Sequence, residues 1–183
     1  MSDTLLAAVI GGLVALTVAL LTQFVAEAYK RHRDGSAVAA AIAGELSSYA
    51  PAWPLLKVQA DAWIDAIRAG RRGELIFRPF ERPTDLIIGE MVSKLGLLGV
   101  EQIEKIALVY GNIRAFRNAL EVILRDHSGM TDEELLSRCQ ACIAALDRAR
   151  REGLPLVVEL RARARKPFLW SVPSVIATPN DHI

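Results

Sequence analysis

The chain has 183 residues, 52% of them hydrophobic, and its 22 Lys and Arg residues nearly balance its 21 Asp and Glu residues, for a formal net charge of +1. The length is sufficient for one domain with a hydrophobic core, and the mean hydropathy of +0.26 is high for a soluble protein. A dedicated nucleic-acid-binding domain would be basic over its whole length, and disorder or a fibrous repeat would lack such a concentrated apolar stretch. Two cysteines exclude a disulfide framework.

The first apolar stretch predicts a membrane-spanning helix. Residues 4–25 contain no charged side chain, and twelve of them are Leu, Ile, Val or Phe. At a rise of ~1.5 Å per residue they form roughly 33 Å of helix, enough to cross a hydrocarbon core of ~30 Å. The alternative is a cleaved signal peptide, because Ala26, Glu27 and Ala28 form a small-x-small site. The missing basic residue before the run and the length of the run oppose that alternative.

The residues that flank the apolar run predict its orientation. Lys30, Arg31 and Arg33 follow it, whereas no Lys or Arg precedes it. The positive-inside rule therefore predicts a single-pass membrane protein, with the N-terminus outside and residues 26–183 in the cytoplasm.

Small side chains within the run predict self-association. Ala7, Gly11, Ala15 and Ala19 recur at four-residue steps, and Gln23 continues the row. Such a row lets two helix backbones approach closely, and a polar residue at its end can hydrogen-bond across the pair. The alternative is that Ala and Gly are simply common in membrane helices.

The rest of the chain predicts helices only. Ser36 is expected to cap a helix that Pro51 and Pro54 interrupt, and a second helix is expected over 55–69. A loop over 70–83 follows, and then a short helix that Thr84 or Asp85 caps and that ends near Gly96.

The C-terminal half predicts longer helices. We expect one over 100–126, one that a capping box at 131–134 opens and that reaches Gly153, and one from Pro155 to about Lys166, with an irregular tail after Pro167. The predicted core consists of apolar side chains at helical spacing: Leu55, Leu56, Ala62, Trp63, Ala66, Ile67, Ile103, Ile106, Ala107, Tyr110, Ile113, Phe116, Leu120 and Ile123.

These elements predict an all-α fold, in which an N-terminal transmembrane helix is followed by an antiparallel helical bundle. The cytoplasmic extension of the membrane helix is expected to be the first helix of the bundle. The predicted divisions are a transmembrane anchor over 1–26, a cytoplasmic helical bundle over 27–166 and a C-terminal tail over 167–183.

A search for catalytic or metal-binding motifs points away from an enzyme. Cys139 and Cys142 have C-x-x-C spacing, but no second pair completes a zinc site, and two half-buried thiols on a core face are expected instead. The acid pairs lie at helix starts or on outward faces. No Arg lies four to six residues before His127, as an all-helical ribonuclease of the HEPN type would require. We therefore expect no catalytic residues, no metal and no cofactor, with an enzyme of unfamiliar site as an alternative.

Two clusters of cations indicate contact surfaces. The first is Arg161, Arg163, Arg165 and Lys166, which precede Phe168, Leu169 and Trp170. Cations beside aromatic rings suit an anionic membrane surface, although RNA binding, or a solvated helix end whose aromatic segment folds back onto the bundle, would also fit. The second surrounds the long loop and is the predicted surface for a cytosolic protein partner: Arg71, Arg72, Phe77, Arg78, Phe80 and Arg82.

Two stretches carry a resemblance to known proteins. The anchor followed by Lys30 and Arg31, and the segment from Ser93 to Leu98 before a helix that reaches Tyr110, resemble a group of uncharacterised bacterial proteins with one membrane helix and a small cytoplasmic helical domain. The same layout is similar to the membrane-pore accessory proteins of RNA-targeting CRISPR systems, which assemble as rings and depolarise the host in phage defence. The resemblance implies a self-associating membrane protein with a cytoplasmic interaction domain, or alternatively a pore-forming effector of defence.

Overall fold

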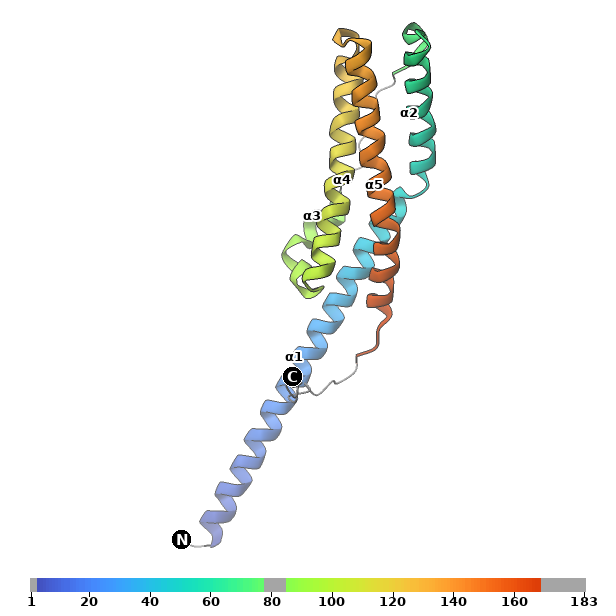
Figure 1. Cartoon of the computed structure of the whole chain (residues 1–183). Coiled ribbons are helices and arrows are strands. Elements are labelled where there is room, and N and C mark those ends of the chain that lie inside the picture. Colours follow the sequence, from blue (N-terminus) through green and yellow to red (C-terminus); the bar gives the residue numbers. More distant parts are fainter. Residues whose placement is uncertain (1–2, 78–84, 169–183) are drawn as a thin grey trace, which may run out of the picture. The chain divides into compact units, whose positions relative to one another are not determined.

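The structure is a computed structural model, and it describes residues 3–77 and 85–168. The described residues form helices joined by turns and contain no strand, which confirms the all-α prediction (Figure 1). The α-helices are α1 (Asp3–Tyr49), α2 (Ala52–Arg68), α3 (Leu86–Met91), α4 (Val100–Asp126) and α5 (Asp132–Arg165). Short 3₁₀ helices are η1 (Arg72–Glu74), η2 (Val92–Leu97) and η3 (His127–Gly129).

The chain divides into two compact units, which are described separately below. The N-terminal unit comprises residues 1–34 together with 166–183, and the helical unit comprises residues 35–165. Helix α1 contributes its first part to one unit and its last part to the other.

Helix α1 does not begin at Ser36 as predicted, because it runs without interruption from Asp3 to Tyr49. Gly35, next to the predicted cap, has a packing role: a Cβ there would lie 3.0 Å from the Leu97 carbonyl oxygen. The missing side chain therefore lets η2 approach the helix. The helix ends where expected, since Pro51 disfavours helical backbone in the residue before it.

The predicted break at Gly153 and Pro155 is also wrong, because α5 continues through both residues. Gly153 is buried, and a Cβ there would lie 3.4 Å from both Trp53 Cη2 and Val109 Cγ1. Gly153 therefore lies at a closely packed position inside the helix and does not end it. Pro155 lies within the helix on its solvent-exposed face. The next residue, Leu156, lies on the face that is buried in the core.

Helix α4 begins and ends at the predicted residues, and the glycine before it explains its start. Gly99 has φ +95°, a backbone conformation that favours glycine. Half of the predicted capping box at the start of α5 is present, because the Glu134 N–H donates to Thr131 Oγ1 at 3.1 Å. The Glu134 carboxylate instead pairs with Arg138 at 2.8 Å.

Two clusters of buried side chains form the core of the helical unit, in which α4 and α5 lie side by side (Figure 1). The predicted core is confirmed over most of α4 and wrong in part for α2. Leu55 is 74% exposed and Ala62 is exposed, whereas Trp53, Ala60 and Ile64 are buried. Helix α2 begins at Ala52, three residues before the predicted start, and the face that packs against α5 is the one that carries Trp53, Ala60 and Ile64.

Candidate functional site

The apolar run of α1 is exposed over residues 7–25 within the N-terminal unit. Its large apolar side chains between Val9 and Phe24 are 47–67% exposed. The predicted row of Ala7, Gly11, Ala15, Ala19 and Gln23 is exposed as well. A Cβ at Gly11 would meet no heavy atom within 4 Å. The small residues therefore leave an open surface along the helix, and their role in self-association stays a prediction.

Aromatic and basic residues gather just beyond this run in the same unit. The Phe168 ring lies 5.5 Å from the Tyr29 ring, edge to face at 86°, and 5.6 Å from the His32 ring. This contact places Lys166 in the same unit as Lys30, Arg31 and Arg33. Four of the predicted membrane-interface cations therefore lie in one unit.

The other predicted membrane-interface residues are distributed differently. Arg161, Arg163 and Arg165 end α5 in the helical unit, where Arg161 donates a hydrogen bond to Ser47 Oγ at 2.8 Å. Trp170 lies outside the described residues.

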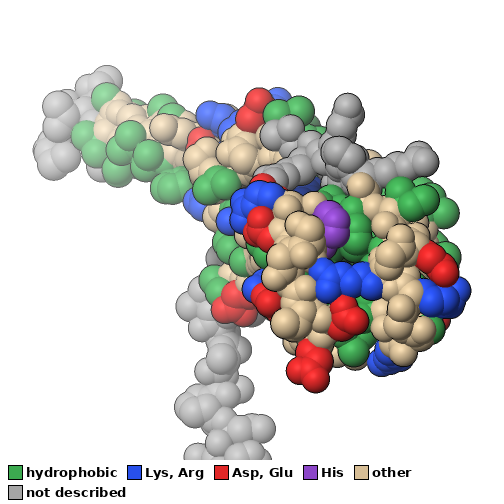
Figure 2. All heavy atoms as spheres, turned by 90° about the horizontal axis from the view of Figure 1, so that it is seen from above, with side chains coloured by type: hydrophobic (Ala, Val, Ile, Leu, Met, Phe, Trp, Pro, Cys, Tyr) green, Lys and Arg blue, Asp and Glu red, His purple; other side chains and the backbone are tan. Residues whose placement is uncertain are grey.

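Arg72 of the predicted partner-binding loop has contacts inside the helical unit. Arg72 donates to the Met130 carbonyl oxygen at 2.7 Å and to Asp132 at 2.8 Å, and it also donates to the His127 carbonyl oxygen. Figure 2 views the helical unit from the end that carries the turn between α4 and α5. It shows Lys or Arg side-chain atoms in the space between the helices there. These bonds attach the loop after α2 to the turn between α4 and α5.

The aromatic residue of this loop is also engaged within the unit. The Phe77 ring lies 4.0 Å from the His127 ring and 4.9 Å from the Trp63 ring. Arg71 is exposed and pairs with Glu74 at 3.2 Å, while Arg78, Phe80 and Arg82 lie outside the described residues. Partner binding by this loop stays a prediction, since intramolecular contacts account for Arg72 and Phe77.

An apolar cavity of about 540 Å³ lies beside the loop, with walls from α2 and α4. Its lining is mostly aliphatic and aromatic and includes Leu56, Trp63, Phe116 and Leu120, with Glu74 as its carboxylate. Figure 2 shows recessed hydrophobic side chains between the helices, with charged side chains at the surface around them. The lining also includes the Cys142 thiol and the Gln59 amide.

The sequence analysis missed a buried carboxylate in the helical unit. Glu45 is 7% exposed and accepts three hydrogen bonds: from the backbone N–H groups of Ile87 and Ile88 at 3.1 Å each, and from the Tyr110 hydroxyl at 2.5 Å. It therefore caps α3 from a distant helix. Burial, followed by the hydrogen bond to Glu45, raises the pKa of Tyr110 far above its ordinary value. The sequence signal was a lone acid in the apolar stretch from Ala37 to Leu46.

A second polar group lies next to this one. Asp85, predicted as a side-chain cap for the short helix, accepts hydrogen bonds from Arg117 at 2.7 Å and Tyr49 at 2.9 Å. The Arg117 guanidinium lies 5.3 Å from the centre of the Tyr49 ring. Burial raises the pKa of Tyr49 to about 12. Since every charge here has a partner within the unit, the arrangement holds α3 in place and offers no free general acid or base.

The two cysteines lie on the core face of α5, as predicted, and are more deeply buried than expected. Cys139 is 1% and Cys142 2% exposed, and both are free thiols. Burial raises the pKa of Cys139 to about 11 and that of Cys142 to about 12. Because the thiolate is the reactive form, both side chains stay protonated and unreactive near neutral pH.

Comparison of the chain with protein-family models, with curated proteins and with solved structures gives no match. One helix among the described residues is long and apolar enough to cross a membrane, judged by length and composition.

Proposed function

We propose that the chain is a non-enzymatic, single-pass inner-membrane protein that self-associates and presents an antiparallel helical bundle in the cytoplasm. The observation that carries the proposal is the exposure of the apolar run of α1, whose large side chains are 47–67% exposed between Val9 and Phe24. Contact of this surface with water is unfavourable, whereas lipid chains would solvate it while the helix satisfies its own backbone hydrogen bonds.

The flanking charges support the proposed orientation. Lys30, Arg31 and Arg33 follow the run, so the helical unit would lie on the cytoplasmic side. That compartment is reducing, which agrees with two buried, free thiols.

Membrane extraction and cysteine labelling test the anchor and its orientation. We expect the full chain, produced in bacteria, to stay in the membrane pellet after sodium carbonate treatment. A membrane-impermeant maleimide applied to spheroplasts should label an Asp3→Cys variant, whereas the exposed Ser137→Cys site on α5 should be labelled only after lysis. Release by carbonate would contradict the anchor, and the reverse labelling pattern would contradict the orientation.

Crosslinking tests self-association through the small-residue row. We expect a Gly11→Ile, Ala15→Ile double variant to reduce crosslinked oligomers in membranes several-fold, because branched side chains would hold the two backbones apart. Gly12 is a matched control, since it neighbours the row and a Cβ there also meets no heavy atom within 4 Å. Equal crosslinking of the double variant and a Gly12→Ile, Leu16→Ile control would contradict this interface.

The polar groups of the run favour an anchor over a pore. The hydroxyls of Thr17 and Thr22 donate to the carbonyl oxygens of Leu13 and Val18 at 2.8 Å each. Gln23 is then the polar side chain of residues 7–25 without such a bond. One amide per chain offers little to line a water-filled path across ~30 Å of hydrocarbon. We therefore expect expression of the protein to leave the membrane potential unchanged.

A further inference from the structure

We propose that the residues just beyond the apolar run form a binding site for the headgroups of anionic phospholipids. This site, called the collar below, consists of Tyr29, Lys30, Arg31, Arg33, Lys166 and Phe168, all in the N-terminal unit. The proposal rests on the membrane anchoring proposed above, and it adds a selectivity for lipid charge that an anchor alone does not have.

The position of the collar cations along the bilayer normal supports the site. Lys30 lies five residues beyond Val25 and Arg33 eight residues beyond it, which correspond to about 7.5 Å and 12 Å along the helix axis. A bilayer extends about 5–8 Å beyond each face of its hydrocarbon core before bulk water begins. If the apolar run fills the core, the Lys30 backbone lies at the outer edge of this layer and the Arg31 backbone, at about 9 Å, just beyond it, so their long side chains can reach back to the lipid phosphates.

The contact of Phe168 with α1 also supports the site. Phe168 packs edge to face against Tyr29 at 5.5 Å and also lies 5.6 Å from His32. The Tyr29 side chain is still 53% exposed. Aromatic rings favour the boundary between lipid chains and headgroups. The ring contact holds Lys166, two residues before Phe168, at this same boundary.

The collar also contains cations that have no ion-pair partner among the described residues. Lys30, Arg31 and Lys166 are exposed, and they make no hydrogen bond or ion pair with the described part of the chain. Arg33 pairs with Asp34 at 3.4 Å, in an exposed and therefore weak ion pair. Beyond Val25, the described residues of this unit hold four cations (the three above and Arg33) against two acids (Glu27 and Asp34). Phosphate oxygens of anionic lipids complement this excess.

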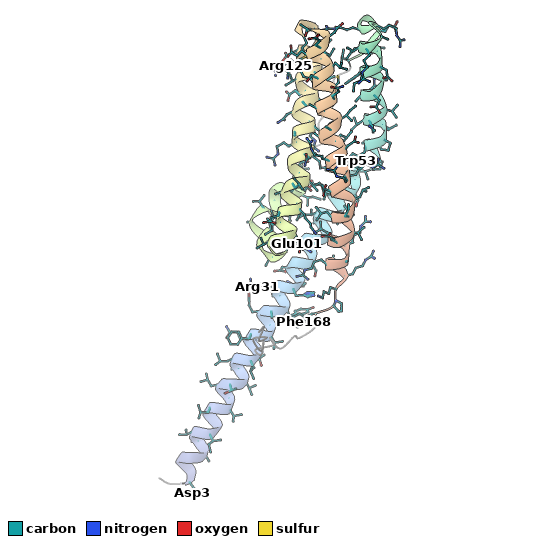
Figure 3. All side chains as sticks on the ribbon, in the orientation of Figure 1. Asp3, Arg31, Trp53, Glu101, Arg125 and Phe168 are labelled. Carbon is teal, nitrogen blue, oxygen red and sulfur yellow. The ribbon has the colours of Figure 1, made fainter. Side chains whose placement is uncertain are left out.

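The cations are spread around the helix. Successive helical residues differ by about 100° in direction, so Arg33 lies within about 60° of Lys30, whereas Arg31 points about 100° away from Lys30 and about 160° away from Arg33. Figure 3 shows Arg31 on the side of α1 away from Phe168. More than one lipid headgroup can therefore contact the collar at the same time.

The test measures the lipid selectivity of the full chain reconstituted in phosphatidylcholine vesicles that contain spin-labelled phosphatidylglycerol or spin-labelled phosphatidylcholine. We expect the wild-type chain to associate with the labelled phosphatidylglycerol about fivefold more strongly, the ratio that ~1 kcal/mol for one interfacial cation implies. A Lys30→Gln, Arg31→Gln, Lys166→Gln variant should lower this ratio close to one.

A control with the same loss of charge separates the collar from net charge. Arg138, Arg150 and Arg151 are exposed on α5, and their replacement by Gln should leave the ratio unchanged. An equal fall in both triple variants would overturn the collar in favour of a general effect of charge.

The ring contact has a separate readout. If Phe168 holds Lys166 in the collar, Phe168→Ala and Lys166→Gln should each lower the ratio by the same factor, and the double variant should lower it no further. Additive effects would contradict this role of Phe168. A chain that fails to reconstitute at all overturns the membrane anchor, whereas a chain that inserts and shows a ratio of one overturns only the collar.

Discussion

Replacement of Glu45 by alanine is expected to lower the free energy of unfolding of the helical unit by about 3–5 kcal/mol. The substitution leaves three donors without their acceptor: the buried Tyr110 hydroxyl and the partly buried backbone N–H groups of Ile87 and Ile88. It also removes the cap that α1 provides for α3. Few single substitutions in this chain affect so many partners at once.

Thermal or guanidinium unfolding of the full chain in detergent, followed by tryptophan fluorescence, measures this change. The fluorescence reports on the helical unit because Trp53 and Trp63 are buried in its core. Glu104→Ala is the matched control, since Glu104 is an exposed glutamate on α4 and its loss should cost less than about 0.5 kcal/mol. Tyr110→Phe should cost about 1–1.5 kcal/mol, because it removes one of the three donors. Equal stability of the Glu45 and Glu104 variants would show that Glu45 does not hold α3.

Replacement of Pro155 by alanine should have a large effect in the opposite direction, a stabilisation of about 2–3 kcal/mol. Pro155 lies in the interior of α5, where it has no N–H to donate to the carbonyl oxygen of Arg151. Its side chain is exposed, so alanine loses little packing. Alanine restores one helical hydrogen bond and removes the clash of the proline ring with the preceding turn.

The same unfolding measurement tests this second prediction. Val158 is 67% exposed on the same helix, and Val158→Ala should raise stability only by the difference in helix propensity, about 0.5 kcal/mol. The difference between the two variants isolates the effect of proline. A Pro155→Ala variant less stable than the wild type would mean that α5 requires the proline geometry.

The polar group around α3 shows why this site could not be predicted. Glu45, Asp85, Tyr110 and Arg117 come from α1, the start of α3 and α4, and they lie 32–65 positions from their partners in the sequence. A lone glutamate in an apolar stretch indicates only that a partner is needed. Which donors surround it depends on how three helices pack.

Local signals determined the parts of the fold that were predicted correctly. Hydrophobic spacing located α4 from Val100 to Asp126, and Thr131 marked the start of α5. Pro51 marked the end of α1. The sequence alone also determined the uncharged run over residues 4–25 and the cations after it, because both are properties of composition.

Some residues have a local sequence context that fits more than one structural role, and for these only the tertiary structure decided the role. Gly153 suggested a helix end, yet it lies inside α5, and Gly35 lies inside α1, where the Leu97 carbonyl oxygen approaches the space that a side chain would occupy. The contact of Phe168 with Tyr29 brings Lys166 beside the cations of α1, and no local pattern encodes it. Periodicity and capping act over a few residues and can be read in order along the chain, whereas close packing, buried hydrogen bonds and ring contacts depend on distances that only the folded chain defines.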